Sequence, residues 1–260
     1  MDKQMRDEAD AAVHAWYDDN AERFADAAAI EIPFVGLSAD AQERMNRFKL
    51  FAIDHGIHVA LQGKNVLEFG AGHGRLALAY PSMASYLGVD YSANLVALGT
   101  QRLARAGLSD RARLVHGDVL SFAETMAAFD VVCSLGMLTY FPDPEPALRK
   151  MSEYLKPGGI LFADFRCTSW LYGALRRLKW AIKKPTGGVS YLCHPTAIEA
   201  MLARIGLTEI QVVSREFPLL AGLHARQGWD WPLALRNAIA DSRGLRMFAT
   251  DAWVFATKRA

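Results

Sequence analysis

The sequence of 260 residues predicts an α/β protein with a doubly wound sheet of seven strands, mostly parallel and closed by an antiparallel last strand. Three observations support this fold class. Short apolar segments alternate with helical patterns through the middle of the chain. A glycine-rich turn, Gly70–Gly74, directly follows the first apolar segment and leads into a helical pattern. The run Phe129–Leu135 is apolar enough for a strand that is buried on both faces.

The expected strands are short and are bounded by turn residues. Their expected ranges are Lys64–Phe69, Tyr86–Asp90, Ala112–His116, Phe129–Leu135, Ile160–Phe165, Glu209–Val213 and Ala252–Thr257. We expect the last two to form the antiparallel pair that completes the sheet.

Helix signals fill the intervals between these strands. Ser92 is a candidate N-cap, Gly107 is a candidate terminator, and Pro81 ends the helix that follows the glycine turn. The expected helices cover residues 75–80, Ala93–Ala106, Pro144–Leu155 and Pro195–Ile205. The third begins with Asp143 followed by proline and ends at Lys156-Pro157-Gly158-Gly159.

Four segments describe the expected domain organisation. They are a helical N-terminal cap at 1–62, a binding core at 63–165, an inserted basic amphipathic lid at 166–194, and a C-terminal completion of the sheet with a substrate-side loop at 195–260. Within the lid, Trp170–Lys184 places an apolar stripe beside basic residues. One interpretation is a peripheral contact with an anionic membrane surface or an amphiphilic substrate, and the other is an ordinary cap helix with a solvated basic face.

The composition is that of a folded soluble protein, with 52% hydrophobic and 22% charged residues. A formal net charge of +1 provides no general attraction to nucleic acid. The three cysteines have no C-x-x-C spacing, which indicates reduced thiols and neither a metal site nor a disulfide framework. With no signal-peptide pattern and no apolar run long enough to span a bilayer, we expect a cytoplasmic protein. The oligomeric state is left open.

The glycine turn indicates a nucleotide cofactor. Gly70 and Gly72 can adopt positive φ, and the lack of side chains lets main-chain N–H groups approach a polar ligand. The dinucleotide pattern G-x-G-x-x-G is broken by Arg75, which stands where the last glycine would be. Glu68, near the carboxyl end of the first strand, would repel a pyrophosphate but suits a ligand with an ammonium group. These features favour a cationic nucleotide over NAD.

Five segments, in matching order and spacing, resemble the motifs of class I S-adenosylmethionine-dependent methyltransferases that act on small molecules. They are VLEFGAGHGR at Val66–Arg75, GVDYS at Gly88–Ser92, HGDVLSF at His116–Phe122, FDVVCSLGMLTYFPDP at Phe129–Pro144 and LKPGGILFADF at Leu155–Phe165. The resemblance is strongest over Lys64–Phe165. It implies a Rossmann-like fold, S-adenosyl-L-methionine as the methyl donor and S-adenosyl-L-homocysteine as the product.

The resemblance also implies roles for individual residues. Asp90 would accept both ribose hydroxyls, Tyr91 would lie along the adenine, and Asp118 would accept the adenine amine beside the Val119 main chain. An alternative for Asp118 is a turn aspartate, because Gly-Asp is a common turn dipeptide. The complete set of implied cofactor-binding residues is Tyr17, Glu68, Gly70, Ala71, Gly72, His73, Asp90, Tyr91, Ser92, Asp118, Val119, Leu120, Ser134 and Leu135.

Two residues are candidates for a catalytic role. Many members of the family carry a histidine after the fourth strand, in a phrase like L-x-H-x-x-D-P, and here Tyr140 in LTYFPDP takes that place. Tyr140 would shape the pocket or hydrogen-bond the acceptor. His194, which precedes Pro195, would face the pocket from the lid, or alternatively cap the following helix. Tyr17 lies in AWYDDNAERFA, which resembles an N-terminal phrase that closes over the cofactor.

The sequence therefore predicts a methyltransferase that acts on a small molecule, with oxygen favoured as the acceptor atom and an amphiphilic compound or natural product as the acceptor. An NAD-dependent oxidoreductase is the first alternative, but it leaves Glu68 and the third and fourth motifs without a purpose. A non-catalytic protein that binds the cofactor is the second, since a binding half can be intact while the acceptor pocket is inactive. A nucleic acid acceptor is disfavoured, because Ser134-Leu135-Gly136-Met137 stands where Asn-Pro-Pro-Tyr or Asp-Pro-Pro-Tyr would be.

Overall fold

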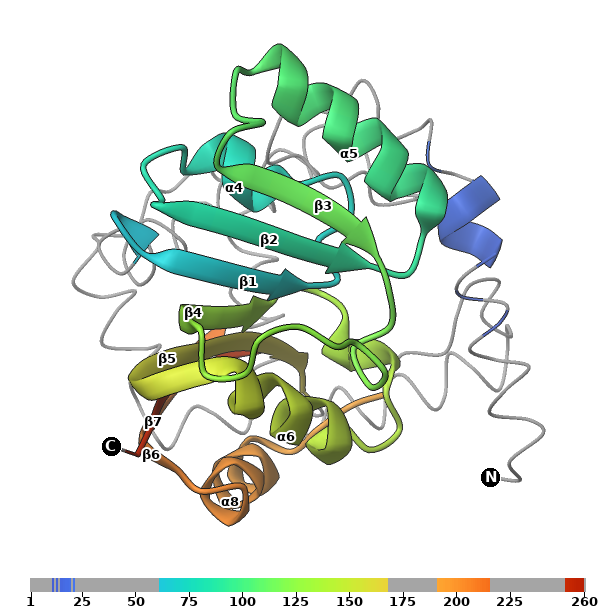
Figure 1. Ribbon diagram of the computed structural model, residues 1–260. Helices are drawn as coiled ribbons and strands as arrows, with labels where there is room; N and C mark the ends of the chain where they lie inside the picture. The colour runs from blue at the N-terminus through green and yellow to red at the C-terminus, as the bar shows by residue number, and fades with distance from the viewer. Residues whose placement is uncertain are drawn as a thin grey trace, which may run out of the picture.

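The computed structural model describes residues 11, 13, 15–19, 21, 61–167, 191–215 and 251–259. In this part of the chain seven strands form one sheet in the order β3-β2-β1-β4-β5-β7-β6 (Figure 1). The strands are β1 (Asn65–Phe69), β2 (Ser85–Asp90), β3 (Ala112–His116), β4 (Phe129–Ser134), β5 (Leu155–Arg166), β6 (Leu207–Arg215) and β7 (Asp251–Lys258). The pairs among β1 to β5 are parallel, and β7 runs antiparallel to both β5 and β6. The expected fold class is confirmed.

The described helical elements lie close to the expected positions. They are α4 (Arg75–Ala79), α5 (Ala93–Arg105), the 3₁₀ helix η2 (Leu138–Tyr140), α6 (Glu145–Tyr154) and α8 (Pro195–Arg204). Ser92 is the N-cap of α5, as expected, and its hydroxyl accepts a hydrogen bond from the Leu95 N–H at 3.2 Å. None of the described helices is long and apolar enough to cross a membrane.

The fifth strand differs from the expectation, because β5 begins at Leu155 rather than at Ile160. Leu155 pairs with Phe129, and the register then shifts before Ile160 pairs with Val131. Two glycines accommodate this irregularity. Gly158 has a φ of 75°, and a Cβ on Gly159 would lie 2.9 Å from the Lys156 carbonyl oxygen. The Pro-Gly-Gly sequence therefore forms a bulge inside β5. The sequence alone predicts that these residues form a turn that precedes the strand.

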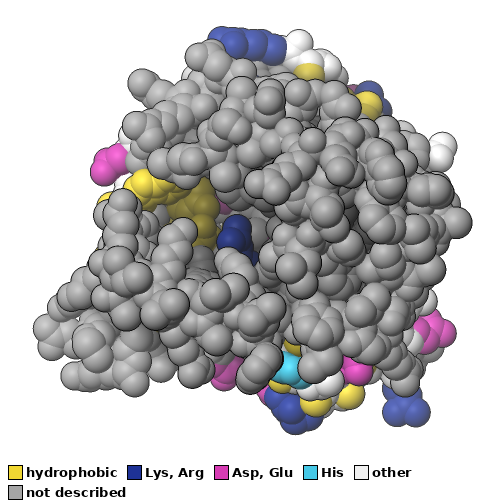
Figure 2. Space-filling view, turned by 180° about the vertical axis from the view of Figure 1, so that it is seen from behind, with side chains coloured by type: hydrophobic (Ala, Val, Ile, Leu, Met, Phe, Trp, Pro, Cys, Tyr) yellow, Lys and Arg dark blue, Asp and Glu magenta, His cyan; other side chains and the backbone are white. Residues whose placement is uncertain are grey.

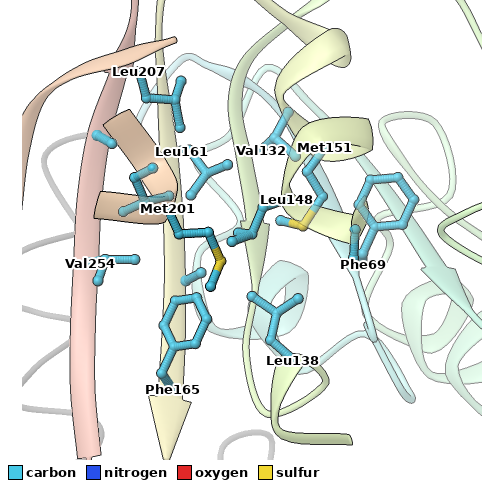
Figure 3. Close-up of a cluster of buried hydrophobic side chains, with 14 of the residues drawn as sticks. Phe69, Val132, Leu138, Leu148, Met151, Leu161, Phe165, Met201, Leu207 and Val254 are labelled. Atoms are coloured by element: carbon cyan, nitrogen blue, oxygen red, sulfur yellow. The ribbon is translucent and has the colours of Figure 1, made fainter. Parts of the chain in front are cut away.

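Two hydrophobic cores cover the two faces of the sheet. One packs the strands against α6 and α8 and includes Leu148, Met151 and Met201 (Figure 3). The other lies on the side of α4 and α5 and includes Leu76 and Leu103. Strand alternation divides β1 between them, with Leu67 and Phe69 in the first core and Val66 in the second. Glu68 follows the parity of Val66, so its side chain lies on the face of the sheet that α4 and α5 cover.

Helix α5 packs closely on the glycine turn because residue 99 has no side chain. A Cβ on Gly99 would lie 2.7 Å from the His73 carbonyl carbon and would overlap Leu114. We expect Gly99→Ala to lower the free energy of unfolding by about 2–3 kcal/mol, since backbone atoms of the turn must move. Chemical denaturation measures this, with the exposed Gln101→Ala on the same helix as the control. Equal stability of the two variants would contradict the expected close packing.

Most of the expected cap at 1–62 and lid at 166–194, including Trp170–Lys184, lies outside the described residues. Their boundaries and roles stay predictions.

Candidate functional site

The candidate site lies at the edge of the sheet where the parallel strands end. In the register, Phe69 of β1 is level with Val89 of β2 and with Ser134 of β4, so the ends of three strands meet there. A helical segment that includes residues 15–19 lies on the side to which the arrowheads of β1, β2 and β3 point (Figure 1). Figure 2 shows the molecule from behind, relative to Figure 1. A hollow is visible on this face, with basic side-chain atoms at its floor beside hydrophobic side chains.

The glycine turn has the expected backbone conformation, with φ of 74° at Gly70 and 54° at Gly72. Its amide groups are used differently from the expectation. The N–H groups of Gly70 and Ala71 donate to the Val89 carbonyl oxygen at 2.9 and 3.1 Å, and that of Gly72 donates to Asp90 Oδ2 at 2.6 Å. The cofactor-binding roles of Gly70, Ala71 and Gly72 stay predictions, and in this structure their amides donate within the protein. Backbone pairing between β1 and β2 thus continues past the end of the strand through Gly70 and Ala71, whereas Gly72 is held by a side chain of β2.

The Asp90 carboxylate fixes the turn to β2. Its Oδ2 accepts the Gly72 N–H, and its Oδ1 accepts the Ser92 N–H at 2.9 Å. A carboxylate offers about four acceptor positions, so these two bonds are compatible with accepting ribose hydroxyls as well. The half-buried carboxylate, at the end of a central strand and held by two amides, fits the expected nucleoside.

The expected adenine site is an open surface next to Asp90. Tyr91 is 45% exposed and Leu120 is 50% exposed, and among the residues that the structure describes few large hydrophobic side chains are so exposed. The Tyr91 ring stands edge-to-face with His116, with 6.0 Å between the ring centroids. Asp118 Oδ1 accepts the Leu120 N–H at 2.6 Å, which is the turn role that the sequence left as an alternative, and Val119 is buried beside it. An aromatic face is thus exposed where the adenine is expected, and the role of Asp118 toward the ring stays a prediction.

Glu68 is a buried acid with one close partner that the sequence analysis did not find. It is 3% exposed, and the Tyr86 hydroxyl donates to its Oε2 at 2.6 Å. Burial raises the pKa of Glu68 to about 7, although the Tyr86 hydrogen bond and the charge of Arg75 both act to lower it. The sequence feature that could have indicated this contact is Gly88, which pairs with Glu68 in the neighbouring strand β2. A Cβ on Gly88 would lie 2.7 Å from the Tyr86 hydroxyl, so the glycine lets Tyr86 reach across to Glu68.

His73 is tied to α5. Its side chain is 2% exposed, and its Nδ1 lies 2.9 Å from an Nη1 of Arg102. Burial, with the charges of Arg102 and Arg75, lowers the pKa of His73 to about 3. The imidazole is therefore neutral at physiological pH, and it stabilises the turn against the helix.

The end of β4 presents an unsatisfied hydroxyl. Ser134 is fully buried, and its Oγ has no hydrogen-bond partner among the residues that the structure describes. Leu135 next to it is half-buried, and the Gly136 N–H donates to Asp164 Oδ1 at 2.6 Å. A buried hydroxyl without a partner is costly, so a polar ligand at this strand end would stabilise it.

Two tyrosines from distant parts of the chain meet over this edge. The hydroxyls of Tyr17 and Tyr140 lie 2.8 Å apart, and their rings stand edge-to-face. Burial is the largest cause that raises the pKa of Tyr17, followed by the interaction with Tyr140. Asp18 anchors the same segment, because its Oδ1 accepts the Ser92 hydroxyl at 2.5 Å. The sequence analysis singled out both tyrosines but neither their contact nor the role of Asp18.

His194, the second catalytic candidate, is the N-cap of α8. The ring is exposed, its Nδ1 lies 2.8 Å from the Thr196 hydroxyl, and it accepts the Thr196 N–H at 3.4 Å. This is the capping role that the sequence left as the alternative. The geometry gives no support to a catalytic role for His194.

Comparisons with known proteins agree with the family resemblance. A family model described as "Methyltransferase domain" matches residues 38–212, which is more than half of the chain. The chain is 33% identical over 106 residues to a ubiquinone biosynthesis O-methyltransferase of Stutzerimonas stutzeri, a match that covers 40% of this chain and 45% of the relative. The chain thus spans about half the length of the curated relatives that it matches.

Solved structures establish the fold. A geranyl diphosphate C-methyltransferase from Streptomyces coelicolor, crystallised with S-adenosyl-L-homocysteine, is similar with a TM-score of 0.69 and 14% identity, covering 96% of this chain and 98% of that one. A magnesium protoporphyrin IX methyltransferase from Synechocystis, also with bound S-adenosyl-L-homocysteine, has a TM-score of 0.64 and 13% identity, covering 96% and 99%.

Proposed function

The chain belongs to the methyltransferase domain family, and we propose that it transfers a methyl group from S-adenosylmethionine to an oxygen atom of a small-molecule acceptor. One observation carries this proposal. Two carboxyl groups, the buried Glu68 and the half-buried Asp90, stand at the ends of neighbouring strands on either side of a glycine turn. A cationic amino-acid end fits the first and a ribose fits the second, and the first would repel a pyrophosphate.

The protein contributes mainly by holding the reactants and excluding water. A bound sulfonium donor supplies a methyl carbon that is already activated by the positive charge on sulfur. Asp90 and Glu68 hold the two ends of the donor, and the Tyr17 and Tyr140 pair covers the edge where the acceptor approaches. Positioning of this kind can provide most of the rate enhancement in a displacement reaction.

The acceptor is inferred from the same pair of tyrosines. Burial raises the pKa of Tyr17 and keeps its hydroxyl protonated, so Tyr17 can hydrogen-bond an acceptor oxygen but does not serve as a general base. An acceptor that ionises readily by itself, such as a phenol, suits this arrangement better than an aliphatic alcohol does. The curated relatives are O-methyltransferases of ubiquinone biosynthesis, which supports oxygen as the acceptor atom.

A labelled-methyl transfer assay with a panel of phenols and catechols tests the function and its two catalytic candidates together. We expect Tyr140→Phe to lower kcat/KM about tenfold, because one hydrogen bond to the acceptor is lost. His194→Asn is the matched variant, since asparagine also caps helices, and we expect it to keep the rate. The opposite ranking of the two variants would contradict the assignment.

Extending the assay to amine and carbon acceptors and to NAD separates the two remaining alternatives. Binding of S-adenosylhomocysteine without methyl transfer to any phenol, amine or carbon acceptor would favour a non-catalytic binding protein. Reduction of NAD in the absence of methyl transfer would favour an oxidoreductase.

A further inference from the structure

We propose that Asp18 is a positioning residue for the reaction. It fixes the orientation of the N-terminal segment, residues 15–19, on helix α5, and so places the Tyr17 hydroxyl against that of Tyr140. The proposal rests on the proposed function, in which the two tyrosines meet the acceptor. Asp18 acts through Tyr17, and no contact with the donor or the acceptor is assigned to it.

Polar contacts join Asp18 to the N-terminus of α5. Its Oδ1 accepts the Ser92 hydroxyl at 2.5 Å and the Asn94 N–H at 3.4 Å, and its carbonyl oxygen accepts the Asn94 side-chain amide at 3.3 Å. The first turn of α5 carries no acidic residue of its own. A carboxylate at a helix N-terminus is stabilised by the amides that have no partner within the helix and by the helix dipole. Asp18 therefore supplies, from a distant part of the chain, the negative charge that α5 lacks.

Apolar contacts hold the same segment on α5 but do not fix its orientation. A small cluster, distinct from the two cores of the sheet, contains Trp16, Tyr17, Ala21, Leu95 and Leu98. Hydrophobic contact is non-directional, so this cluster allows the segment to rotate about its own axis. The hydrogen bonds of Asp18 are directional, and they select one rotation.

That rotation determines where the Tyr17 side chain points. Tyr17 and Asp18 are consecutive residues of a helical segment, in which neighbouring side chains diverge by about 100°. With Asp18 directed at α5, the Tyr17 hydroxyl lies 2.8 Å from that of Tyr140 in η2, which is 123 residues away in the sequence. Since α5 follows β2 and η2 follows β4, the segment contacts elements on both sides of β1.

A competing role for Asp18 is support of the donor site. The Ser92 N–H donates to Asp90 Oδ1, so loss of Asp18 could loosen the expected ribose acceptor instead of misplacing Tyr17. The two roles differ in which substrate is affected. Misplacement of Tyr17 lowers the rate with the acceptor, whereas a loosened Asp90 lowers the affinity for the donor.

A double-mutant cycle tests the link between Asp18 and Tyr17. The measured quantity is kcat/KM for the fastest acceptor of the phenol and catechol panel, at saturating S-adenosylmethionine. We expect Asp18→Ala to lower it about tenfold in the wild-type background, but no more than about twofold in the Tyr17→Phe background, where the hydroxyl to be placed is already absent. Asp18→Asn should stay within about threefold of the wild-type value, because its amide oxygen still accepts the Ser92 hydroxyl.

The matched control is Asp19→Ala, which removes an exposed carboxylate from the next position of the same segment. We expect it to keep the wild-type kcat/KM. Thermal denaturation checks that each variant is folded.

Two further measurements need no turnover. In isothermal titration, Asp18→Ala should bind S-adenosylhomocysteine within about threefold of the wild-type affinity. In hydrogen exchange, amides of a peptide that includes residues 15–19 should exchange about fivefold faster in Asp18→Ala than in Asp19→Ala, because the segment has lost its polar contacts.

Two results would overturn the proposal. One is a loss of S-adenosylhomocysteine affinity in Asp18→Ala that equals the loss of kcat/KM, since Asp18 would then support the donor site. The other is a tenfold effect of Asp18→Ala that persists in the Tyr17→Phe background. Failure of the proposed function looks different, because the wild-type protein would methylate no acceptor while the exchange difference between Asp18→Ala and Asp19→Ala remained. The catalytic role of Asp18 would then fall together with the function.

Discussion

Asp90→Ala is expected to weaken binding of S-adenosylhomocysteine at least about 100-fold. The substitution removes the expected acceptor of the ribose hydroxyls, and charge-assisted hydrogen bonds contribute roughly 1.5–3 kcal/mol each. It also removes the partner of the Gly72 and Ser92 amides, which hold the glycine turn in position. Isothermal titration of the purified variant measures the loss.

Matched variants distinguish the loss of ribose binding from the loss of the hydrogen bonds by which Asp90 stabilises the glycine turn. Asp90→Asn keeps an oxygen that can accept one amide, so we expect a smaller loss of stability than for alanine but a similar loss of affinity. Asp110→Ala, an exposed aspartate away from the edge, should keep the wild-type affinity. An Asp90→Ala variant that is folded and binds with unchanged affinity would refute the ribose site.

The second large effect is a dependence of donor affinity on pH that is caused by Glu68. Burial raises the pKa of this carboxyl group to about 7 from an ordinary value of 4.5, so the acid is mostly protonated below pH 7 in the free protein. A ligand ammonium favours the ionised form. Binding must then release a proton at low pH, and affinity should fall nearly tenfold per pH unit below 7 and level off above it.

The Glu68→Gln variant tests whether Glu68 causes the pH dependence of donor affinity. The variant should bind more weakly at pH 8 and should lose the pH dependence, while titrations in buffers of different ionisation enthalpy should show no proton release. A wild-type affinity that does not change between pH 5.5 and 8 would contradict the role of Glu68.

The raised pKa of Glu68 also makes the stability of the free protein depend on pH. This dependence has the opposite sign to that of donor affinity. Because the folded state holds the Glu68 proton to a higher pH than the unfolded state does, stability without ligand falls as the pH rises from 4.5 to 7. The difference between the wild-type protein and Glu68→Gln should therefore change by about 3 kcal/mol across this range.

Sequence reasoning recovered the sheet because each strand carries its own local signal. The strand β3 was predicted with its observed bounds, Ala112–His116, since Gly117-Asp118 closes it. The start of β5 was not, because Pro-Gly-Gly is typical of a turn and only the pairing with β4 shows that it forms a bulge. Tertiary pairing decided that boundary, and no local pattern could have done so.

The contacts among the candidate site residues could not be predicted from the sequence. Glu68 and Asp90 were identified from their places after the strands, yet the hydrogen bond from Tyr86 to Glu68 depends on the space above Gly88. No local pattern indicated that the Gly70 and Ala71 amides extend the pairing of β1 with β2, or that the Gly72 amide donates to Asp90. Arg75 was noted only for breaking the glycine pattern, because its electrostatic neighbours come from strands far apart in the sequence.

The most direct test of the whole account is a titration of the wild-type protein with S-adenosylhomocysteine and, separately, with NAD. The account expects saturable binding of S-adenosylhomocysteine at one site per chain and no binding of NAD at the same concentrations. Binding of NAD with no heat from S-adenosylhomocysteine would contradict it, because a pyrophosphate would then occupy the edge between Glu68 and Asp90.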